Sequence, residues 1–275
     1  MILFPNCKIN LGLHILQKRT DGYHDLETIF YPLPLSDAIE IIHGNHSIDV
    51  EFSASGINII GNQEDNLCIK AYHLLKKDFP LLSSIRMHLH KVIPMGAGLG
   101  GGSSDGAFTL QLLNKKFHLQ LSEERLLDYA LQLGSDCPFF IRNKPCYATG
   151  RGEMLEAISV DLTNYIIVLI HPGIHVQTAA AFKNVKPNAS RTSLKQTIQF
   201  PIDKWRENLI NDFETSVFAA FPEIAQIKEA LYKAGALYAS LSGSGSTVYG
   251  IFEKQTTPEI SFPSHYFIKT LLAKH

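Results

Sequence analysis

The segment at residues 94–104 constrains this chain most strongly, because five of its eleven residues are glycine. Apolar and polar residues alternate over residues 85–93, which predicts a strand before it, and the pattern of residues 103–113 predicts a helix after it. Successive glycines let backbone N–H groups converge without obstruction by Cβ atoms, and a helix N-terminus adds further N–H groups. The segment therefore predicts a rigid phosphate-binding loop and disfavours a flexible linker.

The letters of this loop also fit other nucleotide-binding patterns. Gly96, Gly98 and Gly101 match the dinucleotide fingerprint G-x-G-x-x-G, which requires a second strand and an acidic residue about 20 positions later. A second predicted helix follows instead, and its acidic residues Glu123 and Glu124 stand at its N-terminus. A Walker loop requires Gly-Lys-Ser/Thr, and this loop contains no lysine. Both interpretations are therefore weak.

A serine hydrolase is the more serious alternative. Gly102, Ser104 and Gly106 fit the pattern G-x-S-x-G, and Asp136 and His171 follow in the order of an α/β-hydrolase triad. A nucleophile elbow, however, is one sharp turn directly after a strand. Here eight loop residues separate the predicted strand from the motif, and the hydrolase interpretation leaves their glycines unexplained. The sequence favours a phosphotransferase over a hydrolase, and a nucleotide-binding module without catalysis stays open.

Composition excludes several further classes. The 275 residues are 45% apolar and 19% charged, so the chain can bury a core and is long enough for two lobes. A net charge of −1 gives no electrostatic reason to expect nucleic acid or a membrane surface as a partner. No apolar run approaches the ~20 residues of a membrane helix, and no signal peptide is evident. The four cysteines form no C-x-x-C pair, which predicts a reduced, cytoplasmic protein.

The rest of the chain mixes antiparallel strand pairs with helices, which predicts an α+β fold. Strand pairs are expected at residues 8–16 with 26–33, 38–43 with 48–52, and 237–241 with 247–252. Helices are expected over residues 66–79, 122–134, 178–182, 205–218 and 223–234. Short apolar strands are expected at residues 139–141 and 165–170, while residues 266–273 fit either a strand or a helix.

Three motifs carry a resemblance to a known family. They are Lys-Ile-Asn-Leu at residues 8–11, the glycine loop at residues 94–104, and Leu-Ser-Gly-Ser-Gly-Ser-Thr at residues 241–247. With these motifs in this order, the chain resembles the GHMP kinases, a family that includes galactokinase, homoserine kinase, mevalonate kinase and phosphomevalonate kinase. The similarity covers about residues 5–252, which is nearly the whole chain.

Two further segments narrow this resemblance. Arg-Thr-Asp-Gly-Tyr-His at residues 19–24 and Gly-Ser-Asp-Cys-Pro-Phe at residues 134–139 are similar to the member that phosphorylates a diphosphocytidyl derivative of methylerythritol, in the non-mevalonate isoprenoid pathway. The resemblance implies transfer of the γ-phosphoryl group of ATP to the 2-hydroxyl of that small-molecule substrate. Another GHMP kinase acting on a different alcohol stays open as an alternative.

The resemblance also implies a two-lobe architecture. Residues 1–158 would form a GHMP kinase N-terminal domain similar to the second domain of ribosomal protein S5, and residues 159–275 a ferredoxin-like C-terminal domain. ATP and the substrate would meet in a cleft between them. Mg²⁺ is expected with ATP, although the sequence shows no protein-only metal cage. No obligate protein partner is evident.

The resemblance assigns catalytic roles to two residues. Asp136 would be the base that takes the proton of the acceptor hydroxyl; otherwise it is a turn or cap aspartate. Lys8 would lie near Asp136, keep its carboxylate ionised and polarise the hydroxyl; otherwise it is a solvated strand lysine. Asn10 fits three interpretations, namely substrate binding, support for Lys8, or an ordinary strand position.

The resemblance assigns the cytidyl group to a second set of residues. Tyr23 can stack on a pyrimidine, and His24 can hydrogen-bond its polar edge; otherwise both merely close a hairpin. Thr178 and Phe182 match a second wall of that site, although Phe182 at helical spacing also fits the core.

ATP binding is assigned by the resemblance to the whole glycine loop, that is, Pro94, Met95, Gly96, Ala97, Gly98, Leu99, Gly100, Gly101, Gly102, Ser103 and Ser104. Residues 242–246 fit two interpretations equally: a segment that closes on the loop or on substrate phosphates, or a tight connection between strands. Asp105 would help to hold Mg²⁺ through water, or would stand in the first helical turn, where negative charge is favourable.

Overall fold

The computed structural model describes residues 1–45, 48–183 and 185–273. The chain divides into two compact units, each built from stretches that are separate in the sequence. The first unit contains Met1–Cys7, Leu35–Met95 and Gly100–Asn143, and the second contains Lys8–Pro34, Gly96–Leu99 and Lys144–His275. The chain therefore passes between the units inside the glycine loop. The predicted domain boundary between residues 158 and 159 stays a prediction.

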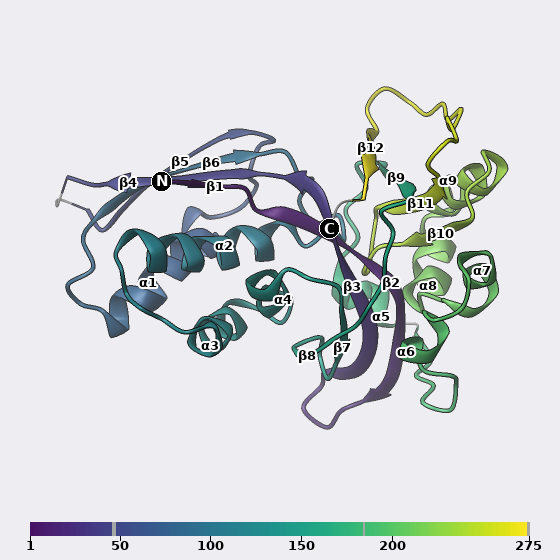
Figure 1. Cartoon of the computed structure of the whole chain (residues 1–275), viewed down its shortest axis with the longest axis horizontal. Helices are drawn as coiled ribbons and strands as arrows, with labels where there is room; N and C mark the ends of the chain where they lie inside the picture. The colour runs from purple at the N-terminus through teal and green to yellow at the C-terminus, as the bar shows by residue number, and fades with distance from the viewer. Residues whose placement is uncertain (46–47, 184, 274–275) are drawn as a thin grey trace. The chain divides into compact units, whose positions relative to one another are not determined.

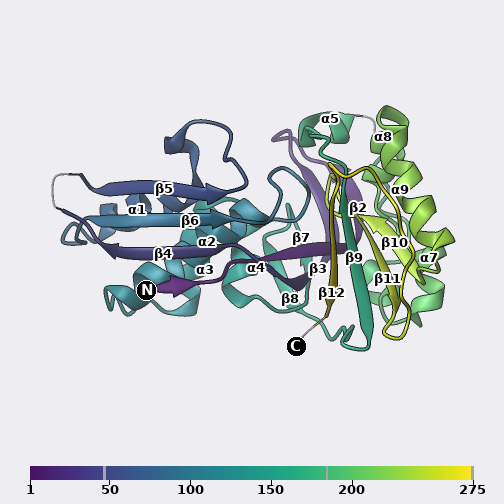
Figure 2. The same ribbon diagram turned by 90° about the horizontal axis from the view of Figure 1, so that it is seen from above.

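The first unit contains a four-stranded sheet in the order β1-β4-β6-β5 (Figure 2). Its strands are β1 (Ile2–Leu3), β4 (Ala38–His43), β5 (Val50–Gly56) and β6 (Ile85–Lys91). β4 is antiparallel to β1 and β6, whereas β5 is parallel to β6. The predicted pairing of residues 38–43 with 48–52 is therefore wrong, because β6 lies between β4 and β5. Strand alternation marks where a strand is, but it does not identify the partner.

Helices cover one face of this sheet (Figure 1). They are η1 (Gln63–Asp65), α1 (Leu67–Asp78), α2 (Gly101–Lys116), α3 (Glu123–Leu133) and α4 (Cys137–Arg142). Side-chain caps begin two of them: Asn66 accepts from Cys68 N, and Ser122 accepts from Arg125 N. The predicted alternation in β6 is confirmed, since Ile85, Met87 and Leu89 are all buried.

Residues 139–141 form part of helix α4, so the prediction of a strand there is wrong. Pro138 stands in the first turn of α4, where its fixed φ and missing N–H are tolerated. Five of the six helical residues are buried, so the segment is apolar without a helical period. A short buried run of this kind cannot be assigned to helix or strand by periodicity.

The second unit contains two four-stranded sheets, β2-β3-β7-β8 and β10-β11-β9-β12. The strands of the first are β2 (Asn6–Lys18), β3 (His24–Ser36), β7 (Cys146–Thr149) and β8 (Met154–Ala157), with β2 and β3 reaching into the first unit at one end. Those of the second are β9 (Tyr165–His171), β10 (Tyr238–Leu241), β11 (Val248–Glu253) and β12 (Phe267–Leu272). The antiparallel pair β10–β11 confirms the predicted hairpin. Residues 266–273, which fitted either a strand or a helix, contain strand β12, which pairs with β9.

The helices of the second unit are α5 (Thr178–Lys183), α6 (Leu194–Thr197), η2 (Ile202–Lys204), α7 (Trp205–Asn208), α8 (Phe213–Ala220) and α9 (Pro222–Lys233). The single helix predicted over residues 205–218 is wrong, because the chain breaks between α7 and α8. Leu13 N donates to Ile210 O at 2.9 Å, so the backbone at the break pairs with β2. Across the part of the chain that is described, no helix is long and apolar enough to cross a membrane.

A charged cluster is buried in the first unit. Lys91 donates to Asp105 Oδ2 at 2.7 Å and to Asp37 Oδ2, and all three side chains are almost completely buried. Asp37 Oδ1 also accepts from Val92 N at 2.5 Å and Ile93 N at 2.8 Å. Asp105 is therefore in a buried ion pair in the second turn of α2, and its expected place in the first helical turn is wrong. Burial raises the pKa of Asp105, although the neighbouring Lys91 opposes this shift.

Candidate active site

The glycine loop is held by its carbonyl groups. Three consecutive ones accept hydrogen bonds from distant segments of the second unit: Ala97 O from Thr247 N at 3.1 Å, Gly98 O from Ser242 Oγ at 2.8 Å, and Leu99 O from Lys8 N at 3.0 Å. In a planar trans peptide the C=O and the following N–H point in opposite directions. These bonds therefore turn the N–H groups of the loop away from the protein donors, as a cradle for an anion requires.

Two glycines of the loop leave no room for a side chain. Gly98 has φ +78°, and a Cβ there would lie 1.9 Å from Ser242 O. Gly96 has φ +62°, and its Cβ would lie 2.7 Å from His175 Nδ1. Gly102 differs, because apart from its chain neighbours and the backbone of its own helix no described atom lies within 4 Å of the place of its Cβ. The backbone is thus packed tightly at residues 96–98 and has open space beside residue 102.

Helix α2 begins at Gly101, two residues earlier than the sequence predicts. Gly100 precedes it in the left-handed conformation, with φ +70°. The bond from Ser104 N to Gly100 O, at 2.9 Å, is the first of the helical type. The N–H groups of residues 101–103 therefore precede the helical ladder and stand at the positive end of a 16-residue helix.

The serine hydrolase interpretation is wrong. Ser104 lies inside helix α2 and is 0% exposed, so its hydroxyl does not stand on an exposed elbow. The proposed triad histidine is engaged elsewhere, because His171 Nδ1 is 3.0 Å from Ser246 Oγ. Burial lowers the pKa of His171 to about 4, so this ring is neutral at pH 7.

Asp136 is positioned near the N-terminus of α2 within the first unit. Helices α2 and α4 pack together, and the Ser103 side chain is hydrogen-bonded to Cys137, the residue after Asp136. Asp136 is half-buried and its side chain makes no capping hydrogen bond to α4, which argues against a capping role. Burial raises the pKa of the Cys137 thiol to about 12, so the thiol stays protonated.

Lys8 is held inside the second unit and is 3% exposed, so the interpretation as a solvated strand lysine is wrong. Its Nζ donates to Asn10 Oδ1 at 2.6 Å and to Gly98 O at 3.2 Å, and it lies 5.0 Å from the centre of the Phe30 ring. Asn10 thus supports Lys8, the second of the three interpretations of that residue. The predicted pairing of Lys8 with Asp136 stays a prediction.

Two of the four residues assigned to the cytidyl group contact each other within the second unit, and a third contacts residues 242–246. The rings of His24 and Phe182 stack with their centres 4.6 Å apart and an angle of 16° between them. Thr178 Oγ1 is 3.1 Å from Ser244 Oγ. Tyr23 is exposed, and its ring instead faces the Arg151 guanidinium at 5.0 Å. Burial lowers the pKa of His24, with Lys18 adding to the shift, so its ring can both donate and accept a hydrogen bond at pH 7.

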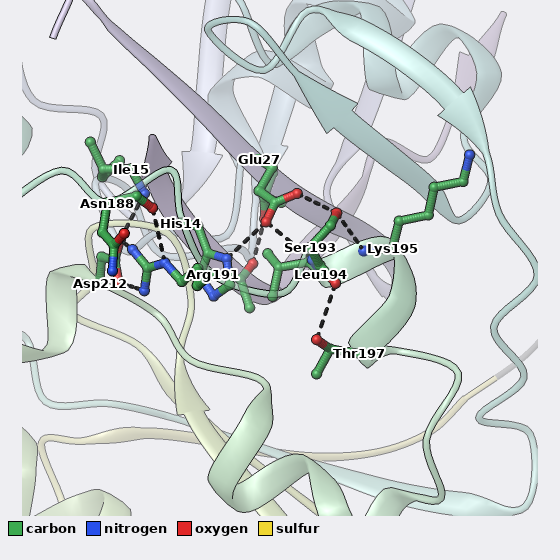
Figure 3. A network of polar contacts seen from close by, with 12 residues as sticks. His14, Ile15, Glu27, Asn188, Arg191, Ser193, Leu194, Lys195, Thr197 and Asp212 are labelled. Carbon is green, nitrogen blue, oxygen red and sulfur yellow. Dashed lines mark hydrogen bonds and ion pairs between the residues drawn. The ribbon is translucent and has the colours of Figure 1, made fainter. Parts of the chain in front are cut away.

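A buried carboxylate ties strand β3, which begins at His24, to the segment after α5. Glu27 on β3 accepts from His14 Nδ1 at 2.8 Å, Tyr147 Oη at 2.5 Å, Ser193 Oγ at 2.6 Å and Leu194 N at 3.1 Å. Figure 3 shows Glu27 with His14, Ser193 and Leu194. Burial alone would raise the pKa of Glu27, but these four bonds outweigh it and lower the pKa to about 2. Glu27 therefore stays ionised and fixes residues 193–194 against the strands.

Residues 242–246 close on the glycine loop, which favours the first of their two interpretations. Besides the bond from Ser242 Oγ to Gly98 O, the segment is fixed from behind by Asn211. Asn211 is buried, and its Nδ2 donates to Leu241 O at 2.8 Å and to Gly243 O at 2.9 Å.

Sequence reasoning missed two residues that shape this site, His175 beside Gly96 and Asn211 behind residues 242–246. Both act on segments that are at least 30 positions away in the chain. No local motif marks them, because hydrogen-bond partners at such distances are set by tertiary packing. The described residues contain no group of three or more His, Cys, Asp and Glu side chains arranged to hold a metal ion.

Comparison with known proteins agrees with this geometry. The family described as GHMP kinases N terminal domain matches residues 66–144, and GHMP kinases C terminal matches residues 202–260. The chain is 53% identical to 4-diphosphocytidyl-2-C-methyl-D-erythritol kinase of Bacteroides thetaiotaomicron, over 97% of this chain and 98% of that protein. The protein of the same name from Azobacteroides pseudotrichonymphae is 51% identical, over 98% and 100%.

Solved structures agree as well. A crystal structure of 4-(cytidine 5'-diphospho)-2C-methyl-D-erythritol kinase superposes with a TM-score of 0.76 at 29% identity, covering 91% of this chain and 90% of that one. A mevalonate kinase superposes with a TM-score of 0.73 over the whole of both chains at 12% identity, which shows a shared fold. The predicted α+β fold is thus confirmed as the GHMP kinase fold. The chain belongs to the 4-diphosphocytidyl-2-C-methyl-D-erythritol kinase family of the GHMP kinases.

Proposed function

We propose that this protein transfers the γ-phosphoryl group of ATP to the 2-hydroxyl of 4-diphosphocytidyl-2-C-methyl-D-erythritol, as a step of the non-mevalonate isoprenoid pathway. The observation that carries the proposal is the glycine loop, whose carbonyl groups are occupied by Lys8, Ser242 and Thr247 while its N–H groups face the other way. That arrangement suits the phosphate oxygens of a nucleotide. The close relatives named above support the choice of substrate.

Phosphoryl transfer needs an aligned hydroxyl, neutralisation of charge and removal of one proton. Asp136 takes up the proton of the 2-hydroxyl as the bond from its oxygen to the γ-phosphorus forms and the bond to the leaving ADP oxygen breaks. Lys8, held by Asn10 and Gly98, offsets the negative charge that develops on the reacting oxygens. The glycine loop and the N-terminus of α2 hold the phosphate groups in place.

The cytidyl group packs against an aromatic ring in this proposal. His24 and Phe182 are already stacked on each other, and Phe182 is braced edge-on by Phe213 at 4.7 Å. A pyrimidine can stack on such a ring, while the neutral His24 imidazole supplies a donor and an acceptor for its polar edge.

Mg²⁺ enters with ATP in this proposal. Mg²⁺ prefers oxygen ligands and is usually bound through substrate phosphates and few protein groups. Ser104 fits that chemistry, because its buried Oγ has no hydrogen-bond partner among the described residues. The ion would supply charge neutralisation on the phosphate oxygens, and Ser104 is the residue that would help to hold it.

A coupled ADP-release assay tests the proposed function. Purified protein is given ATP with the diphosphocytidyl substrate, and in parallel with galactose, homoserine or mevalonate. We expect ADP release with the first acceptor only. Turnover of another alcohol would point to a different GHMP kinase, and ATP binding without any transfer would point to a non-catalytic nucleotide-binding module.

Gly102→Ala tests the open space beside the loop. We expect the KM for ATP to rise about 10- to 100-fold, since the new methyl group would displace phosphate and a charge-assisted hydrogen bond is worth about 1.5–3 kcal/mol. The free energy of unfolding should stay equal or rise by up to about 1 kcal/mol, because alanine favours a helix more than glycine does. Gly106→Ala in the same helix is the control.

That control should behave in the opposite way. A Cβ at Gly106 would lie 2.9 Å from Leu67 Cβ, so the substitution should lower stability and leave the KM for ATP unchanged. If Gly102→Ala leaves the KM for ATP unchanged as well, the open space is not a phosphate site.

Phe182→Ala tests the cytidyl site. We expect the KM for the diphosphocytidyl substrate to rise about 5- to 100-fold, because stacking of a base on an aromatic ring is worth about 1–3 kcal/mol. The KM for ATP should not change. Phe262→Ala is a matched control. Phe262 stacks on the ring of Tyr266, and both Phe262 and Phe182 pack against the hydrophobic cluster of the second unit that includes Val168 and Phe213. Equal effects of both variants on the KM of the substrate would reject the assignment.

A further inference from the structure

Thr28 contacts Asn10, the residue that supports Lys8. It stands on β3 of the second unit and is 1% exposed. Its Oγ1 is 2.9 Å from Asn10 Nδ2, the amide whose other end, Oδ1, contacts Lys8 Nζ at 2.6 Å. Its Oγ1 also lies 2.6 Å from Gly12 O. Four groups on the neighbouring strands β2 and β3 are thus linked in series, from the Gly12 carbonyl to the Lys8 ammonium.

Counting protons fixes the direction of every bond in this series. A threonine hydroxyl has one proton, and the Gly12 carbonyl can only accept, so the hydroxyl donates to Gly12 O. The hydroxyl oxygen is then left with lone pairs only, and it must accept from Asn10. The NH₂ group of Asn10 therefore faces Thr28, and its oxygen faces Lys8.

This direction matters because an amide has two nearly equivalent orientations. If the Asn10 amide were turned over, its NH₂ group would meet the Lys8 ammonium, which also has only donors. The Asn10 backbone cannot move away to relieve the clash, since its carbonyl accepts from Tyr249 Oη at 2.8 Å. The Thr28 hydroxyl thus selects the orientation in which the Asn10 amide offers Lys8 an acceptor, in addition to Gly98 O.

We propose that Thr28 is a positioning residue for phosphoryl transfer, whose hydroxyl orients the Asn10 amide and thereby holds the Lys8 ammonium in place. This inference rests on the proposed role of Lys8 in the reaction. A purely structural role for Thr28, as a bond between two strands, makes a different prediction: stability falls without a change in turnover.

Thr28→Val removes the hydroxyl at nearly constant volume, and Thr28→Ser keeps it. Thr197→Val is a matched control, because Thr197 is also almost completely buried and donates to the Ser193 carbonyl at 3.1 Å (Figure 3), not to the series that ends at Lys8. Steady-state kcat and both KM values are measured for each variant, with the free energy of unfolding. The acceptor is whichever alcohol the wild-type protein phosphorylates, so the result does not depend on the identity of the substrate.

For Thr28→Val we expect kcat to fall about 5- to 100-fold, because an unsatisfied buried donor costs about 1–3 kcal/mol and here disturbs Lys8. Both KM values should change less than about twofold. Thr28→Ser should restore most of kcat, and Thr197→Val should lose stability without losing kcat. Should Thr28→Val fail to fold, Thr28→Cys takes its place, because a thiol is only a weak donor and acceptor.

A double-mutant cycle then tests whether Thr28 acts through Asn10. If it does, Thr28→Val should lower kcat no further in an Asn10→Ala background, so that the two effects are not additive. The proposal is overturned if Thr28→Val keeps full kcat while folded, if Thr28→Ser loses as much kcat as Thr28→Val, or if the effects of Thr28→Val and Asn10→Ala simply add.

Discussion

Asp136→Asn is expected to lower kcat by about 10²- to 10⁴-fold while leaving the affinity for ATP unchanged. An amide has the size of the carboxylate but cannot accept the proton that the acceptor hydroxyl must lose, and a general base contributes a factor of this order. ATP should still bind, because the phosphate groups are assigned to the glycine loop and α2. A coupled ADP-release assay gives kcat, and isothermal titration calorimetry with ATP gives the affinity.

Asp128→Asn is the control for this substitution. Asp128 belongs to the same unit and is exposed, and its side chain forms a surface ion pair with Arg125 at 3.7 Å. Its loss should change neither kcat nor ATP binding. Wild-type turnover by Asp136→Asn would remove Asp136 from the mechanism, and a loss of ATP affinity equal to the loss of kcat would mean that Asp136 serves binding instead.

Lys91→Met is expected to lower the free energy of unfolding of the first unit by about 3–5 kcal/mol. Lys91 is the cation between Asp37 and Asp105, and the substitution leaves two buried carboxyl groups without it. Burial alone would lower the pKa of Lys91, but the two carboxylates outweigh this and raise it, so the lysine is charged at pH 7. Denaturant unfolding followed by circular dichroism measures the loss.

Lys70→Met is the control for Lys91→Met, because it removes an exposed lysine and shows how much the free energy of unfolding changes without the loss of a buried cation. Lys70 pairs with Asp65 at 3.1 Å on the surface of the same unit, where an ion pair contributes at most about 1 kcal/mol. If Lys91→Met costs no more than Lys70→Met, the buried cluster does not stabilise the fold. The cluster also touches both ends of the glycine loop, since Asp37 binds the backbone at residues 92–93 and Asp105 lies in α2.

Local patterns in the sequence predicted what depends on local geometry. The period of two in β6 located the buried side chains of Ile85, Met87 and Leu89, because a strand places alternate residues on one face. The glycine content of residues 94–104 predicted a tight phosphate loop, and Gly98 does pack where a methyl group could not. The strand predicted at residues 139–141 was wrong because these residues are all buried, so their sequence shows no helical period.

The remaining features depend on partners that are distant in the chain. Lys91 and Asp37 are 54 positions apart, and a sequence shows two ordinary charges without showing that they meet inside a core. The His24–Phe182 stack could be approached only through the family resemblance. The break at Asn211 was missed because an asparagine inside one apparent helical pattern gives no sign that its amide binds the carbonyls of Leu241 and Gly243.

The discontinuous make-up of the second unit limits how this enzyme can be divided or recombined. Leu13 and Ile15, from the start of the chain, share one hydrophobic cluster with Val168 and Ile170, from its second half. A fragment that stops at residue 158 would carry the first pair without the second and would expose them to water. Chimaeras joined at a single midpoint crossover with another kinase would therefore mix two unrelated cores. A functional exchange has to transfer residues 8–34 and 96–99 together with residues 144–275, so the two halves of the sequence are not interchangeable modules.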